Sequence, residues 1–506
     1  MYDGIRKALT ESHRIRSLRI DVGMSEFDCD ETDWLLHKTL SLLQSIQMPR
    51  LEFVHVDLQW YELPGRYSSF LGHHTPENLR HLSLLRGIDI AILPCAHLLA
   101  PSLTHLKLEC ETVWETMEDA LHTLSLLHNL EVLSIDRDKH LDDDPDQPSA
   151  LPDVDMSELM DDVQPVHLPK LRELVLREPL AQIAYLLKNL VFPPTARIDL
   201  HAMKNSVAAE GTVRSSIAVA TSALKAHYAP LVEEGRYFDS LLLDLSVWYR
   251  RRRLLVAADH IAVPSSTITG QHSIRLIPIG LNKHRHICVQ IYKLPFSFCL
   301  CDDNSFSERG LIESFVDLPV FRSARALTFT EEVYSNHTYE RTAPDPFDDS
   351  DPVQWNTMMS PLKQVSVAHF YGHTGVHAIL GLLREDEGVT YSHLVDLTIE
   401  EVSFVAPSEL ASERKPACVS FDTLVSVLNR RTGQDRMQSV ANLRRLKLKS
   451  CDIDRAQIDV LRCDLGEDFV SWDGRQRGTD ESSSHARHER MWSMSAESLG
   501  SSSEEM

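Results

Sequence analysis

The sequence predicts an α/β fold, a leucine-rich-repeat solenoid in which parallel strands form an irregular horseshoe and helices cover its outer face. Three observations predict this fold: one phrase recurs, its early copies start 28, 24 and 27 residues apart, and helical patterns separate several copies. A motif at such a period indicates stacked units rather than one closed core. The phrase is L-x-x-L-x-L, with Val or Ile at some positions, and it starts at Leu51, Leu79, Leu103, Leu130, Leu171, Leu394 and Leu443.

Each phrase predicts one short strand. In Leu103-Thr-His-Leu106-Lys-Leu108, the last two leucines are two residues apart and therefore point to the same side of a strand. Leu103 breaks that alternation, so we place it on the turn that enters the strand. Parallel strands lie about 4.8 Å apart and need long connections, which are usually helices.

Helices are predicted where apolar residues recur with a period near 3.6. Residues 34–46 and 117–127 show this period, and Thr116 or Glu115 could start the second helix. Residues 421–428 form a third such segment, followed by Asn-Arg-Arg, where the helix dipole favours basic side chains.

The region between residues 200 and 320 departs from the regular repeat. Residues 212–228 are rich in alanine and predict a helix. Strands are predicted at 238–247, 274–279, 287–291 and 296–301, and weaker copies of the phrase then start at Ala324 and Leu362.

The last repeat is the most complete one. It matches all five fixed positions of the longer consensus L-x-x-L-x-L-x-x-[NC]-x-L, counting Ile for the final Leu. The matching residues are Leu443, Leu446, Leu448, Cys451 and Ile453. We therefore expect Cys451 to be a buried structural thiol rather than a reactive one.

Four segments follow from these patterns. Residues 1–136 are N-terminal repeats, 137–165 an acidic loop insertion, 166–472 irregular C-terminal repeats, and 473–506 a disordered tail with possible serine phosphorylation sites. The acidic insertion could be a solvated loop or a docking strip for a basic partner. We favour the loop, because runs of charge are usually solvated.

Composition excludes several classes of protein. Lys and Arg number 51 and Asp and Glu 74, so the formal charge is 51 − 74 = −23, which disfavours non-specific binding to nucleic acid or anionic membrane. There is no signal peptide at the start and no apolar stretch near the roughly 18 residues of a membrane span. Nine scattered cysteines indicate a reducing compartment. We therefore expect a cytoplasmic or nuclear protein.

Three histidines stand four residues apart, at His369, His373 and His377. On a helix this spacing could supply metal ligands on one face. Gly372 and Gly375 interrupt the segment, which favours a loop with solvated histidines.

Two other clusters also have a structural interpretation. Cys299 and Cys301, with His284 and His286, could bind zinc, but a second cysteine pair is missing and a packed strand is favoured. The basic run 250–253 could bind an acidic partner or RNA. We favour a solvated rim that pairs with the acidic loops of the chain itself.

No nucleophile-elbow, phosphate-loop or dinucleotide-binding motif is present. The absence of these motifs does not exclude catalysis, but it removes any specific enzyme claim. Because stacked repeats usually present a surface to another macromolecule, we predict a protein that is not an enzyme and that uses no cofactor and no catalytic or structural metal. An enzyme built into the irregular region 200–320 is the remaining alternative.

A solenoid of this kind presents alternate strand residues on its concave face. We predict that this face binds a protein, because curved repeat surfaces commonly do so, although it could equally be ordinary solvent-facing sheet. His81 and His105 should be near neighbours on successive strands. The predicted binding residues are Phe53, His55, Asp57, His81, Ser83, His105, Lys107, Glu109, Ser134 and Asp136.

The chain resembles the fungal F-box/leucine-rich-repeat family over roughly residues 5–470. The resemblance rests on segments 14–20, 48–52, 100–108, 191–196 and 442–448. It implies the substrate-recognition part of an F-box-type (SCF) ubiquitin ligase adaptor. The start of the chain resembles the segment that follows an F-box, so a Skp-type adaptor is expected as a partner only if an F-box lies upstream. The alternative is a repeat scaffold without a ubiquitin-ligase role.

Overall fold

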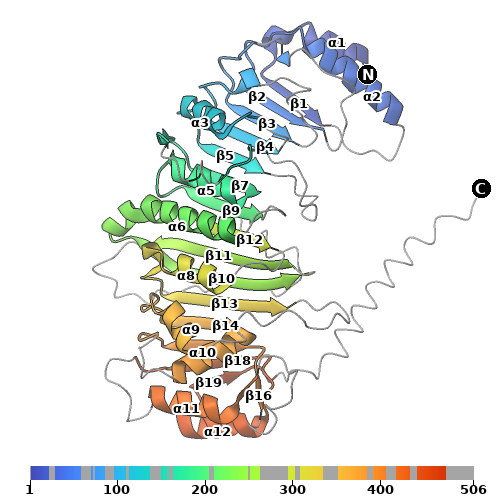
Figure 1. Ribbon diagram of the computed structural model, residues 1–506. Coiled ribbons are helices and arrows are strands. Elements are labelled where there is room, and N and C mark those ends of the chain that lie inside the picture. Colours follow the sequence, from blue (N-terminus) through green and yellow to red (C-terminus); the bar gives the residue numbers. More distant parts are fainter. Residues whose placement is uncertain are drawn as a thin grey trace, which may run out of the picture. The chain divides into compact units, whose positions relative to one another are not determined.

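The protein has an α/β fold with a large, mostly parallel sheet and helices (Figure 1). It forms two compact units: unit 1 comprises 1–238, 247–266 and 279–320, and unit 2 comprises 239–246, 267–278 and 321–506. The computed structural model describes residues 2–21, 29–58, 70–71, 74–85, 96–109, 113–136, 150–155, 159, 163–203, 210–248, 251–262, 294–302, 308–333, 352–383, 391–405, 418–432 and 441–474.

Unit 1 is built on a sheet with the strand order β1-β2-β3-β4-β5-β7-β9-β12-β11. All neighbours in this order pair in parallel except β12 and β11, which are antiparallel. The strands are β1 (Ser17–Asp21), β2 (Phe53–Asp57), β3 (His81–Leu85), β4 (His105–Glu109), β5 (Val132–Asp136), β7 (Glu173–Pro179), β9 (Arg197–Met203), β11 (Arg251–Ala262) and β12 (Phe296–Asp302). A separate two-stranded sheet pairs β6 (Val166–His167) with β8 (Leu190–Val191).

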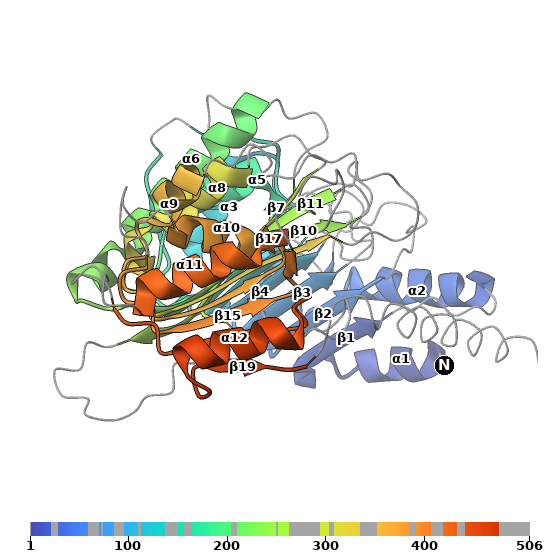
Figure 2. The same cartoon turned by 90° about the horizontal axis from the view of Figure 1, so that it is seen from below.

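The helices of unit 1 are α1 (Tyr2–Leu9), α2 (Cys29–Leu43), α3 (Met117–Leu126), α5 (Leu180–Asn189), α6 (Glu210–Glu233) and α8 (Glu308–Val316), with single 3₁₀ turns at Ser12–Arg14 and Ala96–Leu98. In chain order, α1 precedes the first strand, and the other helices of unit 1 lie between strands. α5 packs against β7, β9 and α6. Helices α3, α5 and α6 lie along one face of the sheet (Figure 2).

Unit 2 repeats the same construction with the strand order β10-β13-β14-β15-β18-β19. The pairs from β13 to β19 are parallel. The strands are β10 (Tyr237–Trp248), β13 (Ala326–Val333), β14 (Val367–Tyr371), β15 (Asp396–Glu400), β18 (Arg445–Lys449) and β19 (Val470–Trp472), with β16 (Ser403–Val405) and β17 (Cys418–Ser420) as a separate parallel pair. The helices are α9 (Pro352–Met359), α10 (His373–Leu383), α11 (Phe421–Thr432) and α12 (Arg455–Leu465). A 3₁₀ turn at Pro319–Phe321 includes the last two residues of unit 1 in this stretch and the first of unit 2.

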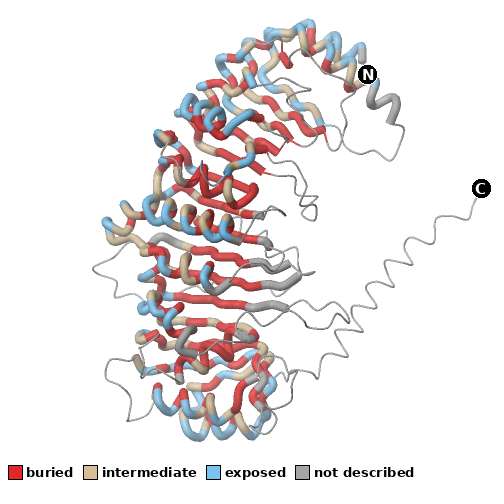
Figure 3. Tube along the Cα trace, viewed as in Figure 1, coloured by how far each residue is buried: buried red, intermediate tan, exposed pale blue. Residues whose placement is uncertain are grey.

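The repeated leucines lie inside, as the phrase predicts. Leu82, Leu106 and Leu133 occupy the same register position on β3, β4 and β5, and each is at most 1% exposed. The first residue of the phrase also behaves as expected, since Leu103 precedes β4 and is fully buried. Figure 3 shows this buried interior along the strands of each unit. Every copy contributes one apolar rung, so the neighbouring copies share a core.

Several sequence predictions of single elements are confirmed. The helices expected at 117–127 and 421–428 are α3 and α11, and the alanine-rich helix is α6. Thr116 is the N-cap of α3, where its Oγ1 accepts a hydrogen bond from the N–H of Asp119 at 3.1 Å. The strands expected at 238–247 and 296–301 are β10 and β12.

The acidic segment is not wholly a solvated loop. Within 137–165, Ala150, Leu151 and Leu159 are at most 2% exposed. The N–H of Ala150 donates to Glu178 Oε1 at 3.2 Å, and Lys188 Nζ donates to the carbonyl oxygen of Leu159 at 3.3 Å. The strands that flank this segment in the sequence, β5 and β7, pair directly with each other. The boundary between the two units therefore lies elsewhere in the chain, near β10.

Other predictions fall on residues that the structure does not describe. They are the strands at 274–279 and 287–291, the histidines His284 and His286, and almost all of the predicted tail.

Candidate functional site

The first candidate surface is the strand face of unit 1 opposite the buried leucines, which we call the unit 1 face. It carries the alternate residues that the sequence predicted for binding. Six of them are partly exposed: Phe53, His55, His81, Ser83, His105 and Lys107. The other four are buried: Asp57 at 8%, Glu109 at 6%, Ser134 at 8% and Asp136 at 1% exposure. Asp57, Glu109 and Asp136 are the last residues of their strands, and Ser134 is the middle residue of β5. These four do not present their side chains to a partner.

Asp136 is buried because it has an internal partner. Arg177, its neighbour in register on β7, donates from Nη1 to Asp136 Oδ2 at 3.1 Å, and both side chains are at most 9% exposed. A buried carboxylate needs such a pairing. This ion pair is structural.

Three rings form a row across the unit 1 face. Phe53, His81 and His105 are register neighbours on β2, β3 and β4. The ring centroids of Phe53 and His81 are 6.0 Å apart, and those of His81 and His105 are stacked at 4.2 Å. The predicted proximity of the two histidines is confirmed. Burial, and then the nearby charges of His105 and Arg80, lower the pKa of His81, so its neutral form is favoured.

His55 lies next to this row and has an acidic partner. Its Nε2 is 3.1 Å from Asp21 Oδ1 on β1. The face therefore combines apolar rings with hydrogen-bonding groups.

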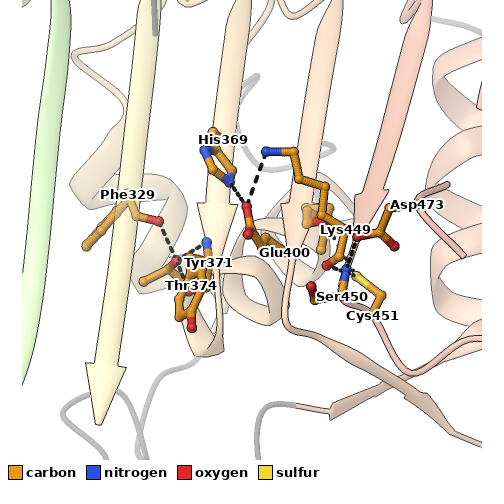
Figure 4. A network of polar contacts seen from close by, with 10 residues as sticks. Phe329, His369, Tyr371, Thr374, Glu400, Lys449, Ser450, Cys451 and Asp473 are labelled. Atoms are coloured by element: carbon orange, nitrogen blue, oxygen red, sulfur yellow. Dashed lines mark hydrogen bonds and ion pairs between the residues drawn. The ribbon is translucent and has the colours of Figure 1, made fainter. Parts of the chain in front are cut away.

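The second candidate surface lies in unit 2, where three strands contribute one polar network (Figure 4). His369 on β14 and Lys449 on β18 both point to Glu400 on β15. Glu400 Oε2 lies 2.8 Å from His369 Nε2 and 3.4 Å from Lys449 Nζ. The glutamate is 4% exposed, so the two partners compensate a buried charge.

Opposing effects set the pKa of Glu400. Burial raises it, whereas the hydrogen bond and charge of His369 and the ammonium of Lys449 lower it. The net pKa lies below the ordinary carboxyl value, so Glu400 is ionised at neutral pH.

The three-histidine segment is therefore not a solvated loop, and that favoured prediction is wrong. His369 lies on β14, while His373 begins α10. His377 is 8% exposed and stacks on Trp355 with ring centroids 5.8 Å apart. Gly372, at φ 65°, makes the turn between strand and helix, a conformation that favours glycine. Among the described residues, no group of His, Cys, Asp or Glu could hold a metal ion.

Thr374 fixes the same turn. It accepts a hydrogen bond at Oγ1 from the N–H of Tyr371 at 3.2 Å and donates to the carbonyl oxygen of Phe329 on β13 at 2.8 Å. It thereby ties the start of α10 to two strands and holds His369 and its strand in place.

Cys451 confirms the prediction of a buried structural thiol. It is fully buried, and its Sγ lies 3.3 Å from the carbonyl oxygen of Lys449 and 3.5 Å from that of Ile399. Burial raises the pKa of this thiol to about 12, so it is not a reactive nucleophile.

A basic row on β18 was missed by the sequence analysis. Arg445, Lys447 and Lys449 alternate with two buried leucines, and all three are exposed. The signal was present in the last phrase, where R-x-K-x-K fills the variable positions. The leucine pattern alone does not mark these positions, because any polar residue satisfies it there.

The His369–Glu400 pair matches part of a catalytic triad, in which a carboxylate orients a histidine that activates a nucleophile. Within the described part of the chain, His369 makes no hydrogen bond to a hydroxyl or thiol that could serve as that nucleophile.

The other predicted clusters yield less. Cys299 is buried in β12, as the packed-strand interpretation expects. The basic run 250–253 overlaps the start of β11, and its side chains lie outside the described set. Within the described residues, no helix combines the length and the apolar character of a membrane span.

Comparison with known proteins finds no match: no family model, no curated protein and no solved structure is similar to this chain.

Proposed function

We propose that this chain is a non-enzymatic, protein-binding leucine-rich-repeat solenoid whose partner docks on the unit 1 face. The observation that supports the proposal is the row of rings formed by Phe53, His81 and His105, which are register neighbours on three strands and remain partly exposed.

The chemistry of this row suits a protein surface. Aromatic and imidazole rings supply apolar area at little conformational cost, and the ring nitrogens offer hydrogen bonds. The chain has a net charge of −23, which disfavours nucleic acid as the partner.

The role of that binding follows the resemblance to F-box/leucine-rich-repeat proteins. In this proposal the chain holds the substrate of an SCF-type ubiquitin ligase in the cytoplasm or nucleus. The alternative is a scaffold that binds protein without ligase recruitment. Both share the unit 1 face and differ only in whether a Skp-type adaptor is bound.

Quantitative affinity capture with the full chain tests the docking face. The double variant His81→Ala/His105→Ala should fold normally and lose specific partners. The matched control is His122→Ala/His128→Ala, which removes two exposed histidines outside the unit 1 face. Equal capture by both double variants would show that the unit 1 face is not the docking site.

Binding of a purified Skp-type adaptor separates the two roles. The assay uses the 506-residue chain and a version extended by any in-frame upstream sequence. Adaptor binding by either form supports the ligase role. Absence of binding by both forms favours the scaffold.

A further inference from the structure

The basic row of β18 is an exposed, positively charged patch of unit 2. Arg445, Lys447 and Lys449 project from the same side of the strand, because alternate residues of a strand share a face. Successive members of the row are therefore about 6.6 Å apart along the strand. The side chains of Arg445 and Lys449 are 54% and 45% exposed, so the guanidinium and ammonium groups reach solvent.

The acidic groups beside this row compensate only its two ends. Arg445 Nη1 lies 3.8 Å from Asp396 Oδ2, and Lys449 Nζ lies 3.4 Å from Glu400 Oε2. Lys447 sits between them, and its register neighbours are the uncharged Thr398 and Ser471.

Within the residues that the structure describes, Lys447 has no ion pair or hydrogen bond from its side chain. Arg445 is also partly available, since its ion pair with Asp396 is solvent-exposed and such pairs are weak. Glu400 is buried and shared with His369, so only part of its charge acts on Lys449.

We propose that the basic row binds an extended, acidic segment of a partner protein, with Lys447 at the centre of the contact. The segment carries anionic groups, carboxylates or phosphates, at alternate positions, which is the spacing that the row itself has. In a chain with a net charge of −23, a local excess of cations attracts such a segment by charge complementarity. The proposal does not depend on docking at the unit 1 face.

A nucleic acid fits this surface less well than a peptide. Three cations offer about three phosphate contacts, which gives little affinity at physiological salt. The carboxylates of Asp396 and Glu400 stand directly beside the row and repel a continuous phosphate backbone. A peptide can place uncharged residues opposite these carboxylates.

Fluorescence anisotropy with the full chain tests the proposal. The probe is a labelled twelve-residue peptide of alternating Glu and Ser. Companion probes replace Glu by Gln, replace Ser by phosphoserine, or are a single-stranded RNA of equal length. The Glu peptide should bind and the Gln peptide should not. Tighter binding of the phosphopeptide, still dependent on Lys447, would assign phosphates as the anions.

Variants locate the contact. Lys447→Gln should weaken binding of the Glu peptide by at least about fivefold, the effect of one charge-assisted contact of roughly 1 kcal/mol. Lys225→Gln, which changes the net charge equally at an exposed helical position, should leave binding unchanged. Glu400→Gln should tighten binding, because it releases Lys449. Thermal unfolding of each variant confirms that it is folded.

Carbodiimide coupling gives a second readout that does not depend on affinity. A carboxylate of the Glu peptide should become joined to Lys447 or Lys449, as mapped by mass spectrometry. The proposal is overturned if Lys447→Gln and Lys225→Gln have equal effects, if coupling maps outside β18, or if the RNA binds more tightly than both acidic peptides.

Discussion

His369 Nε2 lies 2.8 Å from Glu400 Oε2, although the two residues are 31 positions apart in the chain. Parallel register brings them together, since Tyr371 pairs with Glu400 and His369 pairs with Thr398 on the adjacent strand. Glu400 thus keeps its charge inside the fold because neighbouring strands supply its partners.

This arrangement predicts how stability depends on pH. The pKa of Glu400 is lower in the folded chain than its ordinary value of 4.5. The carboxylate therefore contributes stability that is fully present above pH 4.5 and is lost as the pH falls through the folded pKa. Glu400→Gln should remove that part of the acid dependence and destabilise the chain at pH 7 by about 1–3 kcal/mol.

Urea unfolding of the full chain at a series of pH values measures the effect. Glu467→Gln is the matched control, because Glu467 is exposed. If the free energy of unfolding of Glu400→Gln followed the wild-type pH profile, the buried carboxylate would not be stabilised by its partners.

A second acid-sensitive position lies in unit 1. His227 on α6 packs against Phe192, with ring centroids 4.3 Å apart, and burial lowers its pKa to about 4 from 6.5. The unfolded chain therefore binds the proton more readily, and stability falls as the pH decreases from 6.5 to about 4. The loss amounts to about 3 kcal/mol at 1.36 kcal/mol per pKa unit.

The variant His227→Phe tests this origin of acid sensitivity, because it keeps a ring against Phe192 and cannot be protonated. Its stability should change less between pH 7 and pH 4 than that of the wild type, as followed by chemical denaturation of the full chain. His122→Phe, at an exposed position of α3, should retain the wild-type dependence. A wild-type pH profile for His227→Phe would refute the prediction.

The leucine phrase predicted the strands well because burial and alternation act on each copy locally. Leu106 lies on the one apolar side of its own strand, so its inward direction follows from local alternation, and the neighbouring copies then bury it. The same logic placed His81 beside His105, and it identified Cys451 as a buried thiol.

The leucine phrase could not predict contacts between polar side chains on neighbouring strands, because these contacts depend on the register between segments that are distant in the sequence. His369 was assigned to a solvated loop because Gly372 and Gly375 follow it, yet one glycine makes the strand-to-helix turn and the other lies within α10. Gly375 is required there by close packing, since an added Cβ would lie 2.8 Å from Val402 Cγ2. Glu400, the partner that defines the role of His369, is invisible to any local pattern.

Cysteine reactivity should follow burial. Cys451 is fully buried with a pKa raised to about 12, whereas Cys463 on α12 is exposed. Iodoacetamide reacts with the thiolate, so at pH 8 it should modify Cys463 and leave Cys451 at least about tenfold less modified.

Peptide mapping by mass spectrometry after brief alkylation reads this order directly. Denaturation before alkylation should equalise the two cysteines, which is the control for detection. Equal labelling of Cys451 and Cys463 in the native chain would mean that the turn after β18 opens readily.

Replacing Leu106 by Asp tests the apolar ladder of unit 1. Leu106 is fully buried between Leu82 and Leu133, so the variant places a carboxylate where no compensating group lies in register. The lost apolar contact and the buried charge together should cost more than about 3 kcal/mol. Leu126→Asp is the matched control, because Leu126 is 46% exposed on α3 and should tolerate the change. Thermal unfolding followed by circular dichroism should show a large decrease in Tm for the first variant alone, and a normal Tm for Leu106→Asp would contradict a shared apolar interior.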